Sequence, residues 1–271
     1  MKHSHVALFN CENPKSSLLP SKEKSHAGNV TEITPNVSRI STFHPEFGIQ
    51  FNQFLVADEE PFIMHTGMKK MFPTTLEGVS SILDPGKLRW IGFSHFESDE
   101  CGALNEWLSV AARAQAVCSF VGAVVMVNDF ADRPARALAD NEILQTGRYR
   151  LQFLATPHVP HCWDAGLFFE SVQRILFCSD LFFQPEDPEP LTDSSTLGRA
   201  RNAILENLSG PLAHDMPYTA QTNDALKRLA LLHPQTLAAM HGSSFTGDGQ
   251  KEIADLAALF KATIGKGVES L

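Results

Sequence analysis

The sequence predicts a single α/β domain, and three observations support this. Of its 271 residues, 43% are hydrophobic and 20% are charged, which is the balance of a globular protein. Short apolar runs typical of buried strands alternate along the chain with stretches that have the spacing of amphipathic helices. No internal repeat and no linker interrupts this pattern after residue 28. We therefore expect a loosely ordered polar tail over residues 1–28 and one domain over residues 29–271.

The predicted domain begins with a β-hairpin. Residues 47–56 alternate apolar and polar side chains before an apolar end, and residues 61–65 form the return strand after the acidic turn 57–60. A helix is expected over residues 74–83, because its apolar side chains recur on one face and an Asp-Pro-Gly sequence ends it. Residues 90–93 form a short apolar run, which predicts a buried strand.

The remaining elements continue the alternation. Further short apolar runs predict strands over residues 116–120, 148–155, 167–170, 174–178 and 237–240. Apolar residues at helical spacing predict helices over residues 102–112, 121–130, 195–208, 219–233 and 250–264. The segment 184–193 is rich in proline and acidic residues, which predicts a loop.

Composition excludes several classes of protein. The net charge of −9 argues against nucleic-acid binding, because phosphate contacts need clustered lysine and arginine. The five cysteines include no CxxC pair, which favours a reducing, cytoplasmic setting over a disulfide framework. No apolar run approaches the roughly 18 residues of a membrane span, and the first ten residues hold too short an apolar patch for a signal peptide. We expect no contact with membrane.

A dense cluster of potential metal ligands follows the predicted strand 90–93. His95, Glu97 and Asp99 stand two residues apart from one another. If the strand continued, their side chains would all point to one side. The start of a helix at Gly102 indicates a strand-to-helix loop instead, which is where α/β folds place their sites.

Three later residues extend this cluster. His161, Asp180 and His241 each lie at, or just beyond, the end of a short apolar strand. Polar side chains in such a setting need partners or a metal to offset the loss of water. Three histidines and three carboxylates together are the right inventory for two metal ions with one bridging carboxylate.

The order and spacing of these ligands resemble the diiron domain of flavodiiron proteins, which has the metallo-β-lactamase fold. The resemblance covers roughly residues 30–265 and extends beyond the ligands. It is carried also by Asn52-Gln53-Phe54-Leu55-Val56, Leu76-Glu77-Gly78, Asp84-Pro85-Gly86-Lys87-Leu88, Ile175-Leu176-Phe177-Cys178-Ser179-Asp180 and His241-Gly242. It implies an αββα sandwich of two mixed sheets flanked by helices.

The resemblance also implies a function. Two non-haem iron ions would bind, and in some members reduce, O2 or NO, so the protein would be a gas sensor or an oxidoreductase. One iron would be held by His95, Glu97, His161 and Asp180, and the other by Asp99, His241 and bridging Asp180. No catalytic residue beyond these metal ligands is expected. The family's head-to-tail dimers imply a homodimer.

This chain departs from the family pattern in two ways. The family usually has histidine directly after the aspartate, whereas this chain has Glu100, which is a possible further ligand or a partner of bound water. A flavodoxin domain usually follows the diiron domain, and 271 residues leave no room for one. We therefore expect no FMN in this chain and a separate electron-donor protein or signalling partner.

Some assignments stay open at this stage. His158 is a possible ligand, although Trp163-Asp164 resembles the family's sequence after its ligand and favours His161. Cys162 is a candidate redox-sensitive thiol. The alternative function is a metal-dependent hydrolase of the same fold, acting on an ester, lactone or amide. Such hydrolases typically read His-x-His-x-Asp-His, whereas the carboxylates Glu97 and Glu100 favour a hard ion such as ferric iron over zinc. Zinc and manganese remain the alternative metals.

Overall fold

The computed structural model describes residues 29–265. The tail predicted over residues 1–28 lies outside the described residues, as do residues 266–271. The domain boundaries drawn from the sequence therefore remain predictions.

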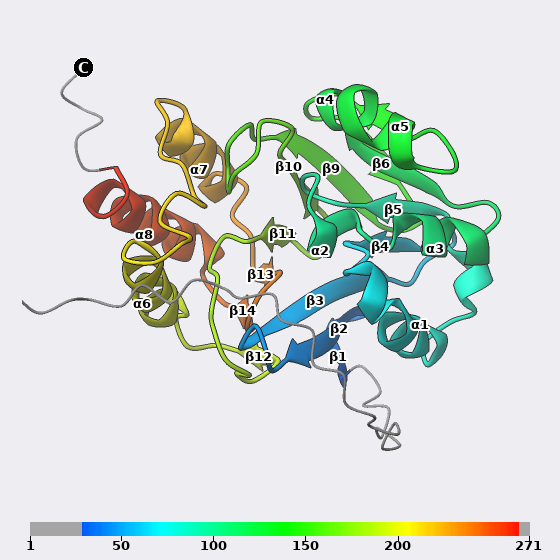
Figure 1. Cartoon of the computed structure of the whole chain (residues 1–271), viewed down its shortest axis with the longest axis horizontal. Coiled ribbons are helices and arrows are strands. Elements are labelled where there is room, and N and C mark those ends of the chain that lie inside the picture. Colours follow the sequence, from blue (N-terminus) through cyan, green and yellow to red (C-terminus); the bar gives the residue numbers. More distant parts are fainter. Residues whose placement is uncertain (1–28, 266–271) are drawn as a thin grey trace, which may run out of the picture.

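Two seven-stranded mixed sheets form the centre of the molecule (Figure 1). The first contains, in spatial order, β1 (Asn29–Thr34), β2 (Val37–His44), β3 (Ile49–Val56), β4 (Phe62–Met64), β5 (Trp90–Gly92), β6 (Gln115–Ser119) and β7 (Arg136–Leu138). The second contains β12 (Leu191–Thr192), β14 (Ser244–Thr246), β13 (Thr236–Ala239), β11 (Ile175–Ser179), β10 (Gly166–Glu170), β9 (Arg150–Ala155) and β8 (Ile143–Gln145). Parallel pairing runs from β4 to β7 in the first sheet, and joins β11 to β13 and β12 to β14 in the second.

Alternation along the strands divides the core into layers. In β3, Phe54 and Val56 face the second sheet, whereas Leu55 faces the helices on the outside. In β11, Phe177 faces the first sheet and Leu176 faces outward. Because side chains alternate between the two faces of a strand, each sheet contributes to a central layer and to one outer layer.

Helices cover both outer faces (Figure 1). The first sheet is covered by α1 (Phe72–Ser80), α3 (Leu104–Val110) and a continuous helical segment made of α4 (Phe120–Gly122), the π-helical turn η3 (Ala123–Val127) and α5 (Asn128–Phe130). The second is covered by α6 (Leu197–Asn207), α7 (Thr222–Ala230) and α8 (Gly249–Ala262). Short helices η1 (Lys69–Met71), η2 (Pro85–Lys87) and α2 (Ser98–Cys101) connect these elements. None of the helices in residues 29–265 combines the length and apolar character needed to cross a membrane.

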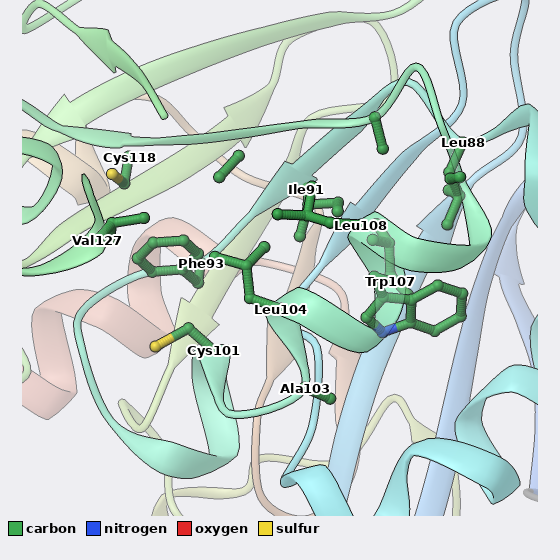
Figure 2. Packing of buried hydrophobic residues seen from close by; sticks show 14 of the residues in the cluster. Leu88, Ile91, Phe93, Cys101, Ala103, Leu104, Trp107, Leu108, Cys118 and Val127 are labelled. Atoms are coloured by element: carbon green, nitrogen blue, oxygen red, sulfur yellow. The ribbon is translucent and has the colours of Figure 1, made fainter. Parts of the chain in front are cut away.

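Helix α3 shows how the outer layers are built. Leu104, Trp107 and Leu108 are buried on its inner face, at the spacing of one helical turn. Figure 2 shows them beside Ile91 and Phe93, which come from β5 and the loop after it. This packing fixes the end of β5, from which the chain continues directly to His95.

The observed αββα sandwich of two mixed sheets confirms the predicted fold class. The predicted elements are present with shifted ends, and the hairpin of β3 and β4 is antiparallel as expected. The prediction missed β1, β2, β7, β8 and β14, and the segment 184–193 holds the short strand β12 as well as loop. In β2 the polar residues Ser38, Arg39 and Ser41 are buried, so the alternation that marks a strand is absent.

Candidate metal centre

Both sheets deliver ligands to one edge of the sandwich. The chain leaves β5 through a loop that carries His95 and Glu97, and Asp99 and Glu100 then lie on α2. This confirms the strand-to-helix interpretation over a continuous strand. His161 lies in the loop between β9 and β10, Asp180 directly follows β11, and His241 lies two residues beyond the end of β13. Because β11 and β13 are parallel neighbours, their carboxyl ends bring Asp180 and His241 to the same edge.

One set of donor atoms surrounds a common point. The Nε2 atoms of His95 and His161 lie 2.9 Å apart, and Oδ2 of Asp180 lies 3.6 and 3.4 Å from them. Glu97 places Oε1 3.5 Å from His161 Nε2, and Oε2 3.9 Å from His95 Nε2. Donors bound at about 2.1 Å to one ion are about 3 Å apart at right angles and about 4.2 Å apart when opposite. We call His95, Glu97, His161 and Oδ2 of Asp180 the first ligand group.

A second set lies on the other side of the same carboxylate. Nε2 of His241 lies 3.1 Å from Oδ1 of Asp180 and 3.4 Å from Oδ2 of Asp99. We call Asp99, His241 and Oδ1 of Asp180 the second ligand group. The two oxygens of Asp180 therefore face different groups, which is the arrangement that a bridging carboxylate requires.

Glu100 provides a test of whether these residues fit a metal. Its side chain is fully buried, and neither carboxylate oxygen has a hydrogen-bond donor among the described residues. Its Oε2 atom lies 3.8 Å from His95 Nε2, and its carboxylate is grouped with those of Glu97 and Asp99. A buried carboxylate without a donor is costly unless a cation compensates it. The residues thus form a possible metal-binding cluster whose donor set fits a pair of ions.

Further contacts, from side chains and from the backbone, orient the histidines. Nδ1 of His95 lies 2.9 Å from the hydroxyl of Ser94, which lies 2.7 Å from the hydroxyl of Ser179. Nδ1 of His241 lies 2.8 Å from the backbone oxygen of Gln50. These contacts leave the Nε2 atoms to face the centre, as is usual for histidines that bind metal. The sequence prediction missed these supports, and only the adjacency of Ser94 to His95 could have suggested one of them.

The electrostatics of the cluster are dominated by buried carboxylates. Burial raises the pKa of Asp180, but hydrogen bonding to His241 and the nearby histidines outweigh burial and hold that pKa far below its usual range. For His241, burial lowers the pKa, whereas hydrogen bonds to Asp180 and Asp99 outweigh it and raise the pKa to about 10. Burial, followed by the charges of Asp180 and Asp99, raises the pKa of Glu100 well above its usual value. Without metal the centre holds protons that an entering cation would displace.

The structure brings together all six residues predicted as ligands, together with Glu100. Among the described residues, His158 does not belong to any set of potential ligand atoms that lie within 4.8 Å of one another. It lines a separate surface groove with Gln221, Asp224 and Arg228, so the structure does not support a place for it in the centre. In contrast, Sγ of Cys162 and the ligand atoms of His95, Glu97 and His161 all lie within 4.8 Å of one another.

A cavity of about 210 Å³ opens above the cluster. Its floor includes residues of both ligand groups, and its walls are mainly apolar. The apolar wall residues include Ile49, Phe183, Ile204, Leu208, Leu212 and Met216. Within the described residues its lining contains no lysine or arginine. Outside the two ligand groups, the described lining therefore offers no cationic side chain to an anionic ligand.

Comparisons with known proteins agree with this architecture. A family model described as "ODP family beta lactamase" matches residues 49–242. The rubredoxin-oxygen oxidoreductase of Megalodesulfovibrio gigas is 26% identical over 211 residues, which are 75% of this chain and 51% of that protein. The flavo-diiron protein FprA2 of Clostridium acetobutylicum is 23% identical, with the same two coverages. The chain thus spans about half the length of these curated relatives.

Solved structures show the same fold. The structure of rubredoxin oxygen:oxidoreductase from Desulfovibrio gigas superposes with a TM-score of 0.74 at 22% identity, covering 85% of this chain and 61% of that one. The flavodiiron protein from Giardia intestinalis gives a TM-score of 0.72 at 19% identity, covering 86% of this chain and 60% of that one. At this level of identity, the likeness supports the fold alone.

Proposed function

Given that the chain belongs to the ODP family of β-lactamase-like proteins, we propose that it is a non-haem diiron protein that binds O2 or NO. The observation that carries the proposal is the carboxylate of Asp180, whose two oxygens face separate sets of donors 3.1 to 3.6 Å away. The relatives named above as a rubredoxin-oxygen oxidoreductase and a flavo-diiron protein support it. We propose that it acts either as a sensor of O2 or NO or as an oxidoreductase that reduces one of them.

The two ligand groups have distinct tasks. The first would hold one iron through His95, Glu97 and His161, and the second would hold the other through Asp99 and His241, while Asp180 serves both. The abundance of carboxylate oxygens favours a hard ion such as ferric iron over zinc, with manganese as an alternative. The chemistry that a bound iron pair supplies is the binding of a small gas with transfer of one electron from each ion.

The protein's own residues prepare the centre. Ser94 holds Nδ1 of His95, and the backbone of Gln50 holds Nδ1 of His241, so both rings keep their orientation. The apolar cavity walls limit the water that reaches the ligands and suit an uncharged gas. We propose that reducing electrons come from a donor outside residues 29–265, and that the protein acts as a homodimer.

The size of the cavity favours one alternative. At about 210 Å³ it exceeds what a diatomic gas fills, which would suit a metal-dependent hydrolase of an uncharged ester, lactone or amide. The carboxylate-rich ligands argue for the diiron function, because hard oxygen donors favour a hard ion such as ferric iron over zinc. The two functions make opposite predictions about metal and substrate.

The test is to load the metal-free protein with ferrous iron without oxygen, measure the bound metal, and record the visible spectrum after adding O2 or NO. We expect about two irons per chain, as the ligand inventory supports, and a new absorption band on gas addition. Two tightly bound zincs, no spectral response after iron loading and turnover of an uncharged ester would contradict the proposal and favour the hydrolase.

Two histidines three residues apart provide a matched control. His161→Ala should lose the iron of the first ligand group, because its Nε2 lies 2.9 Å from that of His95. His158→Ala changes the same loop, but His158 belongs to neither ligand group. This variant should retain both irons and the spectral response. Equal iron content in the two variants would show that the ligand groups are assigned wrongly.

A further inference from the structure

Cys162 differs from the other cysteines that the structure describes. Cys101, Cys118 and Cys178 are buried, and the thiols of Cys101 and Cys178 donate to backbone oxygens. Cys162 is only partly buried, and its Sγ lies 3.5 Å from Oε1 of Glu97. Its partner is therefore one of the proposed metal ligands.

The position of this sulfur matches a ligand of the first group. Its Sγ and the ligand atoms of His95, Glu97 and His161 all lie within 4.8 Å of one another. A metal–sulfur bond is about 2.3 Å and a metal–nitrogen or metal–oxygen bond about 2.1 Å. A sulfur and a second donor on one ion are then about 3.1 Å apart at right angles and about 4.4 Å apart when opposite. The 3.5 Å between Sγ and Oε1 of Glu97 lies within this range, and the 4.8 Å bound places the other donors close to it.

Glu100 supplies an independent sign that a cation belongs here. It is fully buried, its two oxygens lack hydrogen-bond donors among the described residues, and its Oε2 points toward His95 at 3.8 Å from Nε2. This observation does not involve the thiol. It places a further potential oxygen ligand beside the same imidazole that Cys162 approaches.

We propose that Cys162 is a thiolate ligand of the metal in the first ligand group. The inference rests on the proposed function, and it adds a donor that the six predicted ligands do not include. On binding, the S–H bond breaks, its proton leaves to solvent, and a sulfur–metal bond forms with no change in oxidation state.

A sulfur ligand makes the two halves of the centre chemically unlike. The first group then combines two imidazoles, carboxylate oxygens and one soft thiolate, whereas the second holds one imidazole with carboxylates alone. Soft thiolate donors favour zinc or ferrous iron over harder ions. We expect the first group to take up a divalent metal more tightly than the second.

Cobalt(II) is the probe for this inference, because a thiolate bound to cobalt gives an intense near-ultraviolet charge-transfer band. The metal-free full chain is titrated with cobalt under reducing, oxygen-free conditions. We expect the band to develop with the first equivalent of cobalt, and to be lost in Cys162→Ser and in Cys162→Ala. Cobalt affinity in the first step should fall by about tenfold or more, as with other changes around metal ligands.

Two other cysteines serve as controls. Cys118→Ala removes a thiol buried in the outer layer of the first sheet, and Cys11→Ser removes the one outside the described residues. Both variants should keep the band. Cobalt binding by the wild type without the band, or a band that survives in both Cys162 variants, would overturn the inference and leave the proposed function standing. Failure of the wild type to bind cobalt or iron at all would instead overturn the proposed function.

Discussion

Two fully buried glutamates show how differently this fold treats a carboxylate at its two ends. Glu170 ends β10, and its oxygens accept hydrogen bonds from the backbone N–H groups of Arg150, Val172 and Gln173 at 3.3, 2.8 and 2.7 Å. Glu100, on α2, is equally buried but accepts none from the described residues.

The difference separates a structural role from a functional one. Donors for Glu170 come from the fold itself, so burying its charge stabilises the turn between β10 and β11. The region around Glu100 instead concentrates carboxylates and imidazoles and leaves their inner atoms facing one another. A buried carboxylate that the fold does not satisfy marks the place where a cation is expected.

The largest expected effect on stability comes from removing the carboxylate of Glu170, whose hydrogen bonds are all made within the fold. Glu170→Ala leaves three backbone N–H groups without their acceptor, so the free energy of unfolding should fall by about 3 kcal/mol. Urea unfolding with and without metal measures this, and the loss should be the same in both conditions. A loss that depended on metal would break the distinction between the two glutamates.

Glu100→Gln should have the opposite effect on stability and make the metal-free protein more stable. Burial and the neighbouring carboxylates raise the pKa of Glu100, which costs stability at neutral pH. A neutral amide removes this cost, so the free energy of unfolding should rise by about 1 kcal/mol. The wild type should gain about 2.7 kcal/mol from metal at one hundred times its dissociation constant, and the variant should gain less at the same concentration. Glu252→Gln, which changes another buried glutamate, serves as the control. If metal-free Glu100→Gln were markedly less stable, Glu100 would have a structural role after all.

Asp58 extends the comparison to a carboxylate near the surface, where the expected effect is smallest. Burial raises its pKa, but hydrogen bonds from Tyr149 N at 2.9 Å and from the Thr146 hydroxyl at 2.8 Å outweigh burial and lower it. A lowered pKa in the folded state means that this stabilisation is present above the ordinary value of 3.8 and is lost as pH falls through the folded value.

Asp58→Asn should therefore cost about 0.5 kcal/mol at pH 7, a value kept small because the site is well solvated. The difference from the wild type should shrink as the pH is lowered below 3.8. Thermal unfolding of both metal-free proteins across this range measures it. A difference that grew toward acid would show that Asp58 is not stabilised as a carboxylate.

The sequence was most informative where apolar residues recur at the spacing of a strand or a helix. The hairpin of β3 and β4 and the helices α1, α3, α7 and α8 follow from apolar spacing, and the six predicted ligands follow from polar residues at the ends of apolar strands. The αββα arrangement needed the family resemblance. The sheet order and the pairing of β11 with β13 were not predicted, because periodicity does not record which strands are neighbours.

What the sequence did not reveal has physical reasons. Strand β2 buries Arg39 among its polar residues, so its pattern does not resemble a strand, and β7, β8 and β14 are only three residues long. The support of His241 comes from a backbone oxygen of Gln50, which no side-chain pattern can indicate. The proximity of Cys162 to the first ligand group depends on how the β9–β10 loop folds back.

The long separation of the ligands along the chain determines when the centre can exist. His95 follows the first sheet's fifth strand, and His241 comes from the end of the second sheet, so neither group forms until both sheets have docked. The entropy cost of closing loops of this length is offset by burial of the apolar layers and not by binding of an ion. In small zinc domains the metal drives folding, whereas here a folded chain would acquire its metal afterwards. Cellular metal supply would then determine how much of the folded protein carries metal.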